Sequence, residues 1–132
     1  MTIEYFNPPA VHAPRGLYSH TVTVPAGTDL IFISGQVGVR PDGTTPSSIA
    51  EQADQVFANI VAHLKFHGLA PSSIIKLTTF MVAGHDGNAV RAARIKHLGQ
   101  HRPASTAVYV AALVEPEWYV EVDAIAGKPR QP

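Results

Sequence analysis

The sequence predicts an α+β fold in which two helices cover one face of a single sheet. Segments with strand-like alternation outnumber segments with helical periodicity, and two helices are enough to cover only one sheet face. The prolines and glycines, eleven and ten in number, fall mostly between these segments, where they act as breaks. The 132 residues match the size of one ordinary domain, so we expect a single domain over residues 1–132.

The first two expected strands form a hairpin. Residues 17–24 have the alternation of a strand, and residues 29–39 contain the apolar run from Leu30 to Ile33. The sequence Pro-Ala-Gly-Thr at positions 25–28 lies between them and is typical of a turn. We therefore expect these two strands to pair directly with each other.

The first helix has the strongest local signal in the chain. Ser48 followed by Glu51 is a capping box, and Gly68 is a helix stop. Apolar residues recur between them at helical spacing, namely Ile49, Ala53, Val56, Phe57, Ile60 and Leu64. A strand over residues 74–82 follows, so that strand, helix and strand together form a crossover unit.

The second half of the chain predicts one shorter helix and two strands. The helix covers residues 89–98, with Asp86 or Asn88 as its cap and Gly99 as its end. Strands follow over residues 105–112 and 118–126, which gives the element order β-β-α-β-α-β-β. Residues 127–132 are polar and contain two prolines, so we expect them to fray.

The charge composition argues against a nucleic-acid partner and favours association with other subunits. Charged residues make up 15% of the chain, well below the usual quarter, and ten Lys+Arg balance ten Asp+Glu. A chain of zero net charge lacks the basic surplus of a nucleic-acid-binding protein, so no such partner is expected. So few charges leave apolar surface uncovered, and a subunit interface is the usual place for it.

Single features of the sequence argue against cysteine chemistry, a membrane span and secretion. The chain has no cysteine, which rules out disulfides and thiolate nucleophiles. Its apolar runs are too short to span a bilayer, so we expect no membrane partner. Residues 1–9 show neither the basic nor the apolar part of a secretory signal, which predicts a cytoplasmic location.

Residue patterns alone nominate few chemical sites. His63 and His67 have the helical spacing of two metal ligands, but no third ligand is evident and a solvated helix face is favoured. There is no serine-hydrolase elbow and no glycine-rich phosphate loop. Glu121 lies inside an apolar strand, where a carboxylate facing a cleft could hold a water or a proton. The alternation of that strand by itself favours a solvent-facing position for Glu121.

Six segments, in order along nearly the whole chain, resemble the RidA/YjgF family, which is also called the L-PSP family. They are Gly-Leu-Tyr-Ser-His at 16–20, Ile-Ser-Gly-Gln-Val at 33–37, residues 52–60 of the first helix, Lys-Leu-Thr-Thr-Phe at 76–80, His-Arg-Pro-Ala at 101–104 and Glu-Val-Asp-Ala-Ile-Ala at 121–126. No single segment is decisive, but the set is specific.

The resemblance implies a chorismate-mutase-like fold assembled as a homotrimer. The sheets would form a central barrel with the helices outside, and small-molecule ligands would bind in clefts between adjacent subunits. The deaminase members of the family hydrolyse enamine and imine intermediates to a 2-oxo acid and ammonia. They need no metal and no organic cofactor.

The resemblance also assigns roles to individual residues. Glu121 matches the family's glutamate and would orient the attacking water or relay a proton. Tyr18 matches an aromatic residue near the cleft, and the backbone around Gly35 and Ala107 would line it. Arg91 stands in the second helix where the family often carries an asparagine.

Ser105 departs from the pattern of the deaminases. Those members carry an arginine at this position, and its planar guanidinium grips the substrate carboxylate by bidentate pairing. Serine offers one donor and no charge, which places the binding of 2-imino acids in question. The candidates for a replacement cation are Arg15, Arg91 and Arg102.

Two functions from different classes follow. In the first, the chain is a hydrolase acting on an imine, an enamine or a related small compound, with Glu121 handling the water and Tyr18 and Ser105 contacting the substrate. In the second, it is a non-catalytic trimeric protein that binds or senses a small ligand. The ribonuclease role attached to the family name is disfavoured, because the chain has zero net charge and no basic or aromatic stripe.

Overall fold

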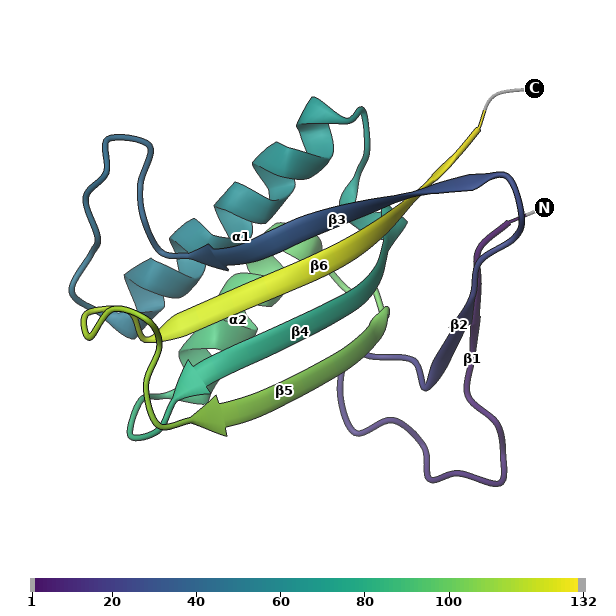
Figure 1. Cartoon of the computed structure of the whole chain (residues 1–132). Coiled ribbons are helices and arrows are strands. Elements are labelled where there is room, and N and C mark those ends of the chain that lie inside the picture. The colour runs from purple at the N-terminus through teal and green to yellow at the C-terminus, as the bar shows by residue number, and fades with distance from the viewer. Residues whose placement is uncertain (1, 131–132) are drawn as a thin grey trace.

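The computed structural model describes residues 2–130 and contains two sheets and two α-helices (Figure 1). Its elements in chain order are β1 (Glu4–Phe6), β2 (Thr21–Thr23), β3 (Thr28–Val37), α1 (Ile49–Phe66), the 3₁₀ turn η1 (Pro71–Ser73), β4 (Ile74–Val82), α2 (Gly87–Leu98), β5 (Ala104–Val110) and β6 (Val120–Pro129). The main sheet has the strand order β3-β6-β4-β5, and β1 and β2 form a separate two-stranded sheet.

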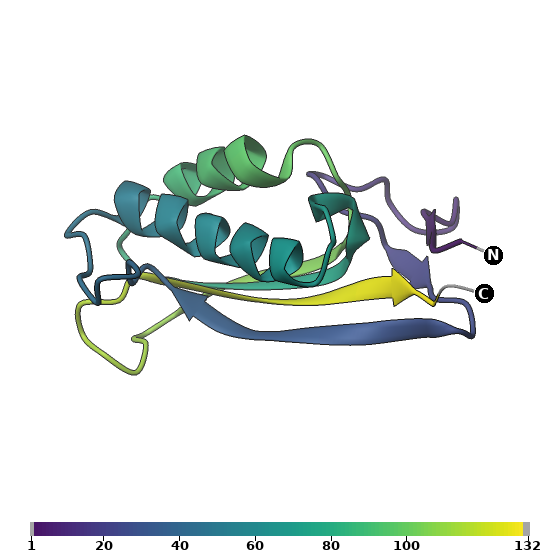
Figure 2. The ribbon, with the colours of Figure 1, turned by 90° about the horizontal axis from the view of Figure 1, so that it is seen from above.

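The two helices lie side by side on one face of the main sheet (Figure 2). This arrangement confirms the predicted α+β class. β6 is antiparallel to both β3 and β4, and β4 is parallel to β5. Because β3 and β4 are both antiparallel to β6, they are parallel to each other, and the predicted crossover through α1 is present. These two strands are not neighbours, however, because β6 lies between them.

The predicted hairpin of residues 17–24 with residues 29–39 is wrong. β2 is only three residues long and pairs with β1, a strand that the sequence analysis missed. β3 pairs instead with β6, and each of these strands has ten residues. A long partner satisfies far more of the backbone donors and acceptors of β3 than the short β2 could, which accounts for the difference.

Helix α1 has the predicted ends and the predicted buried stripe. The Ser48 hydroxyl accepts a hydrogen bond from the Glu51 backbone N–H at 3.2 Å and donates to the Glu51 carboxylate at 3.1 Å. Glu51 thus binds the hydroxyl of its capping partner, whereas the carboxylate of a capping box reaches the cap's backbone N–H. The side chains buried on the sheet side of α1 include Ala53, Val56, Phe57, Ile60 and Leu64.

The remaining elements differ from the prediction mainly at their ends. β4 has the predicted bounds, and α2 begins two residues earlier than predicted, with Asp86 as its cap. Gly99 ends α2 with a φ of 67°, a conformation that favours glycine. Residues 127–129 do not fray, because they continue β6 and pair with the first residues of β3. Residues 131 and 132 lie outside the described part of the chain.

Helices α1 and α2 are tied together by Asp54. Its carboxylate lies 2.7 Å from Lys96 Nζ and 2.8 Å from His97 Nε2. Hydrogen bonds from these two side chains hold the pKa of Asp54 below its usual value. The contact links the two helices at their surface, and the buried side chains of Val90, Ala93 and Leu98 pack α2 into the core.

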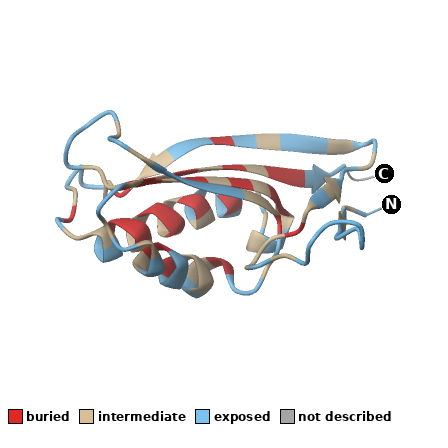
Figure 3. Cartoon of the chain, turned by 90° about the horizontal axis from the view of Figure 1, so that it is seen from below, coloured by how far each residue is buried: buried red, intermediate tan, exposed pale blue. Residues whose placement is uncertain are grey.

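The sheet face away from the helices is uncovered, and we call it the open face. Leu30, Phe32 and Val108 are 49%, 71% and 40% exposed there. Figure 3 shows the contrast, with buried residues on the helix sides that face the sheet and exposed ones along much of β3. An apolar face of this kind in the described chain agrees with the predicted surplus of uncovered apolar surface.

No helix in residues 2–130 combines the length and the apolar character needed to cross a membrane.

Gln52 is a fully buried polar residue of α1 that ties three parts of the chain together. Its Nε2 donates to the carbonyls of Pro46 and Glu117 at 2.9 and 2.8 Å, and its Oε1 accepts from the Tyr119 N–H at 2.8 Å. These bonds hold the loop that follows β3 and the loop that precedes β6 against the start of α1.

The substitution Gln52→Leu should lower the free energy of unfolding by about 3 kcal/mol, because it leaves the Tyr119 N–H and the carbonyls of Pro46 and Glu117 without their hydrogen-bond partner. Urea denaturation of both proteins measures the effect. Gln100→Leu makes the same chemical change at an exposed position and should alter stability by less than about 0.5 kcal/mol. If both variants lose a similar amount of free energy of unfolding, the hydrogen bonds of Gln52 are not the cause of the loss in Gln52→Leu.

Candidate functional site

A cavity of about 270 Å³ lies between α2 and the β4–β5 side of the sheet. Four residues nominated from the sequence line it: Tyr18, Arg91, Ser105 and Ala107. Most of the remaining wall is apolar and includes Leu17, Phe57, Met81 and Val90. A small concave space with an apolar wall and a few polar groups is the usual form of a small-molecule site.

The strand register explains why Ser105 and Ala107 reach this cavity. In the parallel pair, Ser105 lies opposite Leu77 and Ala107 opposite Thr79. Leu77 and Thr79 are buried on the helix side of the sheet, and paired residues in a ladder project to the same side. Ser105 and Ala107 therefore face α2.

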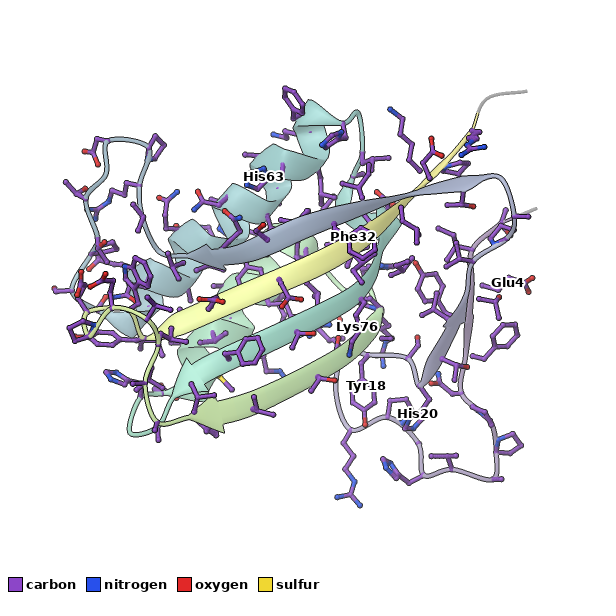
Figure 4. All side chains as sticks on the ribbon, in the orientation of Figure 1. Glu4, Tyr18, His20, Phe32, His63 and Lys76 are labelled. Carbon is purple, nitrogen blue, oxygen red and sulfur yellow. The ribbon has the colours of Figure 1, made fainter. Side chains whose placement is uncertain are left out.

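Tyr18 reaches the cavity from the coil segment that leads into β2. The neighbouring Ser19 forms a bridge with Ala104, and its hydroxyl donates to the Arg102 carbonyl at 2.6 Å. These bonds hold the segment beside the start of β5, which is one of the two edge strands of the main sheet. Figure 4 shows Tyr18 just beyond that edge.

The cavity contains a second arginine, Arg94, which the sequence analysis missed. Its Nη2 donates hydrogen bonds to the Leu17 carbonyl and, at 3.4 Å, to Ser105 Oγ. Burial and then the nearby Arg91 lower the pKa of Arg94. One signal was available, since Arg91 and Arg94 are three residues apart and such residues share a helix face.

Two of the three proposed replacement cations are absent from the lining of the cavity. Arg102 donates from Nη1 to the Gly16 carbonyl at 3.2 Å, and the backbone N–H of Arg15 donates to the Tyr18 hydroxyl at 3.2 Å. Arg91 does line the cavity, and its residue is exposed. Ser105 thus has a guanidinium as its neighbour, and that guanidinium belongs to Arg94.

Glu121 and Gly35 lie together on the opposite face of the sheet. Glu121 is paired with Phe80 of β4 and Val37 of β3, and its neighbours Val120 and Val122 are buried under the helices. Its side chain therefore projects to the open face. A Cβ on Gly35 would come within 2.3 Å of Glu121 Oε2, so glycine leaves room for the carboxylate.

A shallow hollow surrounds Glu121 on this face. It is lined by Phe80 and by the segment 110–114, including Val114, which is 86% exposed. The described chain therefore carries these two hollows on opposite faces of the sheet, the cavity under α2 and the hollow around Glu121. The sheet separates them, so the six nominated residues do not all meet within one chain.

The histidines do not form a metal site in the described chain. No group of three or more His, Asp or Glu side chains within residues 2–130 has metal-binding geometry. His63 and His67 lie near the end of α1, and the backbone of His67 caps that helix. Their spacing of four residues reflects their positions in the last turn and at the C-terminal cap of α1.

Comparison with known proteins assigns the chain to a family. The family model for endoribonuclease L-PSP matches residues 10–128. Protein HMF1 of Saccharomyces cerevisiae is 34% identical over 102 residues, which cover 76% of this chain and 77% of that protein. The chain belongs to the endoribonuclease L-PSP family, also known as the RidA/YjgF family.

Solved structures agree with this assignment. The Rid-family protein YyfB from Yersinia pestis has a TM-score of 0.83 at 26% identity, over 96% of this chain and 98% of its own. The TdcF protein of Escherichia coli, solved with bound serine, has a TM-score of 0.68 at 28% identity, over 91% of each chain. The predicted chorismate-mutase-like fold of the family is thereby confirmed.

The substitution Gly35→Ala should displace the Glu121 carboxylate, because the new Cβ would lie 2.3 Å from its present Oε2 position. A carboxylate at the end of a flexible side chain can move, so the loss of stability should stay below about 1 kcal/mol. A crystal structure and thermal denaturation of the variant would measure both effects.

Gly38→Ala is the matched comparison. Its Cβ would meet the Cα of Gln52 at 2.7 Å, where backbone would have to move. We expect it to lose about 2 to 3 kcal/mol while Glu121 stays in place. An unmoved Glu121 in Gly35→Ala, or equal losses in both variants, would contradict the close approach of Gly35 to this carboxylate.

Proposed function

We propose that this protein binds a small metabolite in the cavity under α2 and hydrolyses a carbon–nitrogen double bond there. The observation that carries the proposal is the cavity itself, in which Tyr18, Ser105, Ala107 and Arg91 meet although they come from three separate segments. The serine-bound structure of the related TdcF supports a small-molecule ligand for this family member too.

The proposed site is completed by a second copy of the chain. Glu121 and its hollow lie on the open face, whereas the cavity lies on the helix side. In the complete site, one copy therefore supplies the cavity and a second copy supplies Glu121. A homotrimer with its open faces turned inward would cover Leu30, Phe32 and Val108 and would bring the hollow of one copy to the cavity of the next. This assembly takes the single domain of each chain as its unit, and we place it in the cytoplasm.

The proposed reaction adds water across the C=N bond. The Glu121 carboxylate accepts a proton from the water as the oxygen attacks carbon, and returns it as the C–N bond breaks. The products are a carbonyl compound and ammonia, or an amine if the nitrogen is substituted. No group beyond water and the side chains is required by this balance.

A second function, ligand binding without turnover, is favoured by Ser105. This residue is uncharged, and the deaminases that the chain resembles have an arginine in its place. A cleft altered in this way would suit a protein that senses or carries the ligand.

The substitution Glu121→Gln should slow the release of 2-oxo acid from freshly generated 2-aminoacrylate by about 100-fold or more, since general acid–base catalysis contributes at least that much. Asp123→Asn is the matched control, because Asp123 lies on the same strand and the same face. It should keep a rate within about twofold of the unaltered protein. If the unaltered protein does not exceed buffer, the non-catalytic function replaces the enzymatic one.

The substitution Phe32→Glu should break up the assembly, because it places a charge in the centre of the apolar face that a trimer would bury. Sedimentation velocity measures the change from trimer to smaller species. Phe66→Glu makes the same change at the end of α1, where the side chain is 85% exposed, and should leave the trimer intact. A monomeric unaltered protein would contradict the two-copy site.

A further inference from the structure

The most unusual charge in the molecule is the guanidinium of Arg94. Its residue is partly buried, and among residues 2–130 no Asp or Glu oxygen lies within 4 Å of it, in contrast to the four ion pairs found elsewhere in that range. The nearby ionisable group that affects its pKa is Arg91, another cation. A cation withdrawn from water and left without a counterion is costly unless something pairs with it.

The hydrogen bonds of Arg94 leave part of its guanidinium free. Both of its bonds come from Nη2 and go to neutral oxygens, those of Leu17 and Ser105. Within the described chain, Nε and Nη1 have no hydrogen-bond partner. Because no buried side-chain nitrogen or oxygen there lacks a partner, these two nitrogens must be accessible, and Arg94 lines the cavity.

We propose that Arg94 is the anion-binding residue of this cavity and that its ligand carries one carboxylate on a short apolar body. The proposal rests on the small-molecule site proposed above and names the chemical class of its ligand. The guanidinium fork matches the two oxygens of a carboxylate, which it binds by parallel hydrogen bonds. Arg94, on α2, thereby supplies the charged, bidentate donor that Ser105, on β5, lacks.

The surroundings of Arg94 favour a carboxylate over a phosphate. A phosphate presents three oxygens and more charge, and it needs several donors around it. The other polar side chains in the lining are those of Tyr18, Thr79, Arg91 and Ser105, and among them Ser105 is hydrogen-bonded to Arg94. Arg91 is exposed, and Leu17, Met81 and Val90 make much of the wall apolar. The apolar wall suits a short aliphatic body, and the volume of about 270 Å³ limits its size.

Arg91 has a different role in this arrangement. It is exposed, unlike Arg94, and lies one helical turn before it. Its charge adds to the positive potential at the cavity, which favours the entry of an anion over that of a neutral molecule of the same shape. Contact with the carboxylate itself falls to Arg94, which is the arginine next to Ser105.

The test compares pyruvate with pyruvamide, which have the same shape but differ in charge. Isothermal titration calorimetry of the unaltered protein should show at least about tenfold tighter binding of pyruvate, as expected for hydrogen bonds to a charged group. Arg94→Met should lose most of this preference and bind the two compounds within about threefold of each other, because the charge of Arg91 remains. Arg94→Lys should bind pyruvate with intermediate affinity, because the ammonium keeps the charge but lacks the fork.

Arg40→Met is the matched control, since Arg40 pairs with Glu51 far from the cavity, and it should bind pyruvate as the unaltered protein does. Orthophosphate is titrated in parallel, and tighter, Arg94-dependent binding of orthophosphate than of pyruvate would overturn the carboxylate assignment. If Arg94→Met does not fold, protection of Arg94 from phenylglyoxal by pyruvate in the unaltered protein decides the question, and absence of protection overturns the proposal.

The outcomes separate the two proposals. Equal binding of pyruvate and pyruvamide by the unaltered protein, or full pyruvate affinity in Arg94→Met, overturns the role of Arg94 and leaves the small-molecule site intact. Binding of neither compound contradicts both proposals, because the cavity then holds no ligand of this size.

Discussion

The central position of β6 is the constraint on which the rest of this structure depends. β6 is hydrogen-bonded to β3 on one side and to β4 on the other, so its side chains must alternate strictly between the two faces of the sheet. Val120 and Val122 enter the core beneath the helices, and Glu121 between them is forced onto the open face. A shift of one residue would exchange these positions and bury a carboxylate in the core.

The same alternation divides the candidate site into two parts. The cavity lies on the helix side of β5, and the glutamate lies on the other side of the sheet. A protein with few charges and an exposed apolar sheet face has a physical reason to associate, because association removes that face from water. In the assembly that we propose, the interaction that covers the face is also the one that completes the site.

Local signals in the sequence predicted the helices and β4 well, and long-range pairing was where prediction failed. The cap at Ser48, the stop at Gly99 and the stripe from Ala53 to Leu64 act within a few residues, so their effect is visible in the sequence. The residues of β6 that pair with β3 lie between 84 (Val37 with Glu121) and 101 (Thr28 with Pro129) positions further along the chain. Strand alternation alone does not say which strands pair. The sequence therefore predicts the nearest strand as the partner of β3, and this prediction is wrong.

The sequence by itself determined the α+β class, the ends of α1, the family and the individual residues Tyr18, Ser105 and Glu121 as points of interest. Only the tertiary structure decided which of these residues share a face, because that depends on the register of strands distant in sequence. It also decided which arginine neighbours Ser105. Arg94 stands in a helix of low apolar content and has no motif of its own. It lines the cavity because α2 packs against the β4–β5 side of the sheet through Val90, Ala93 and Leu98.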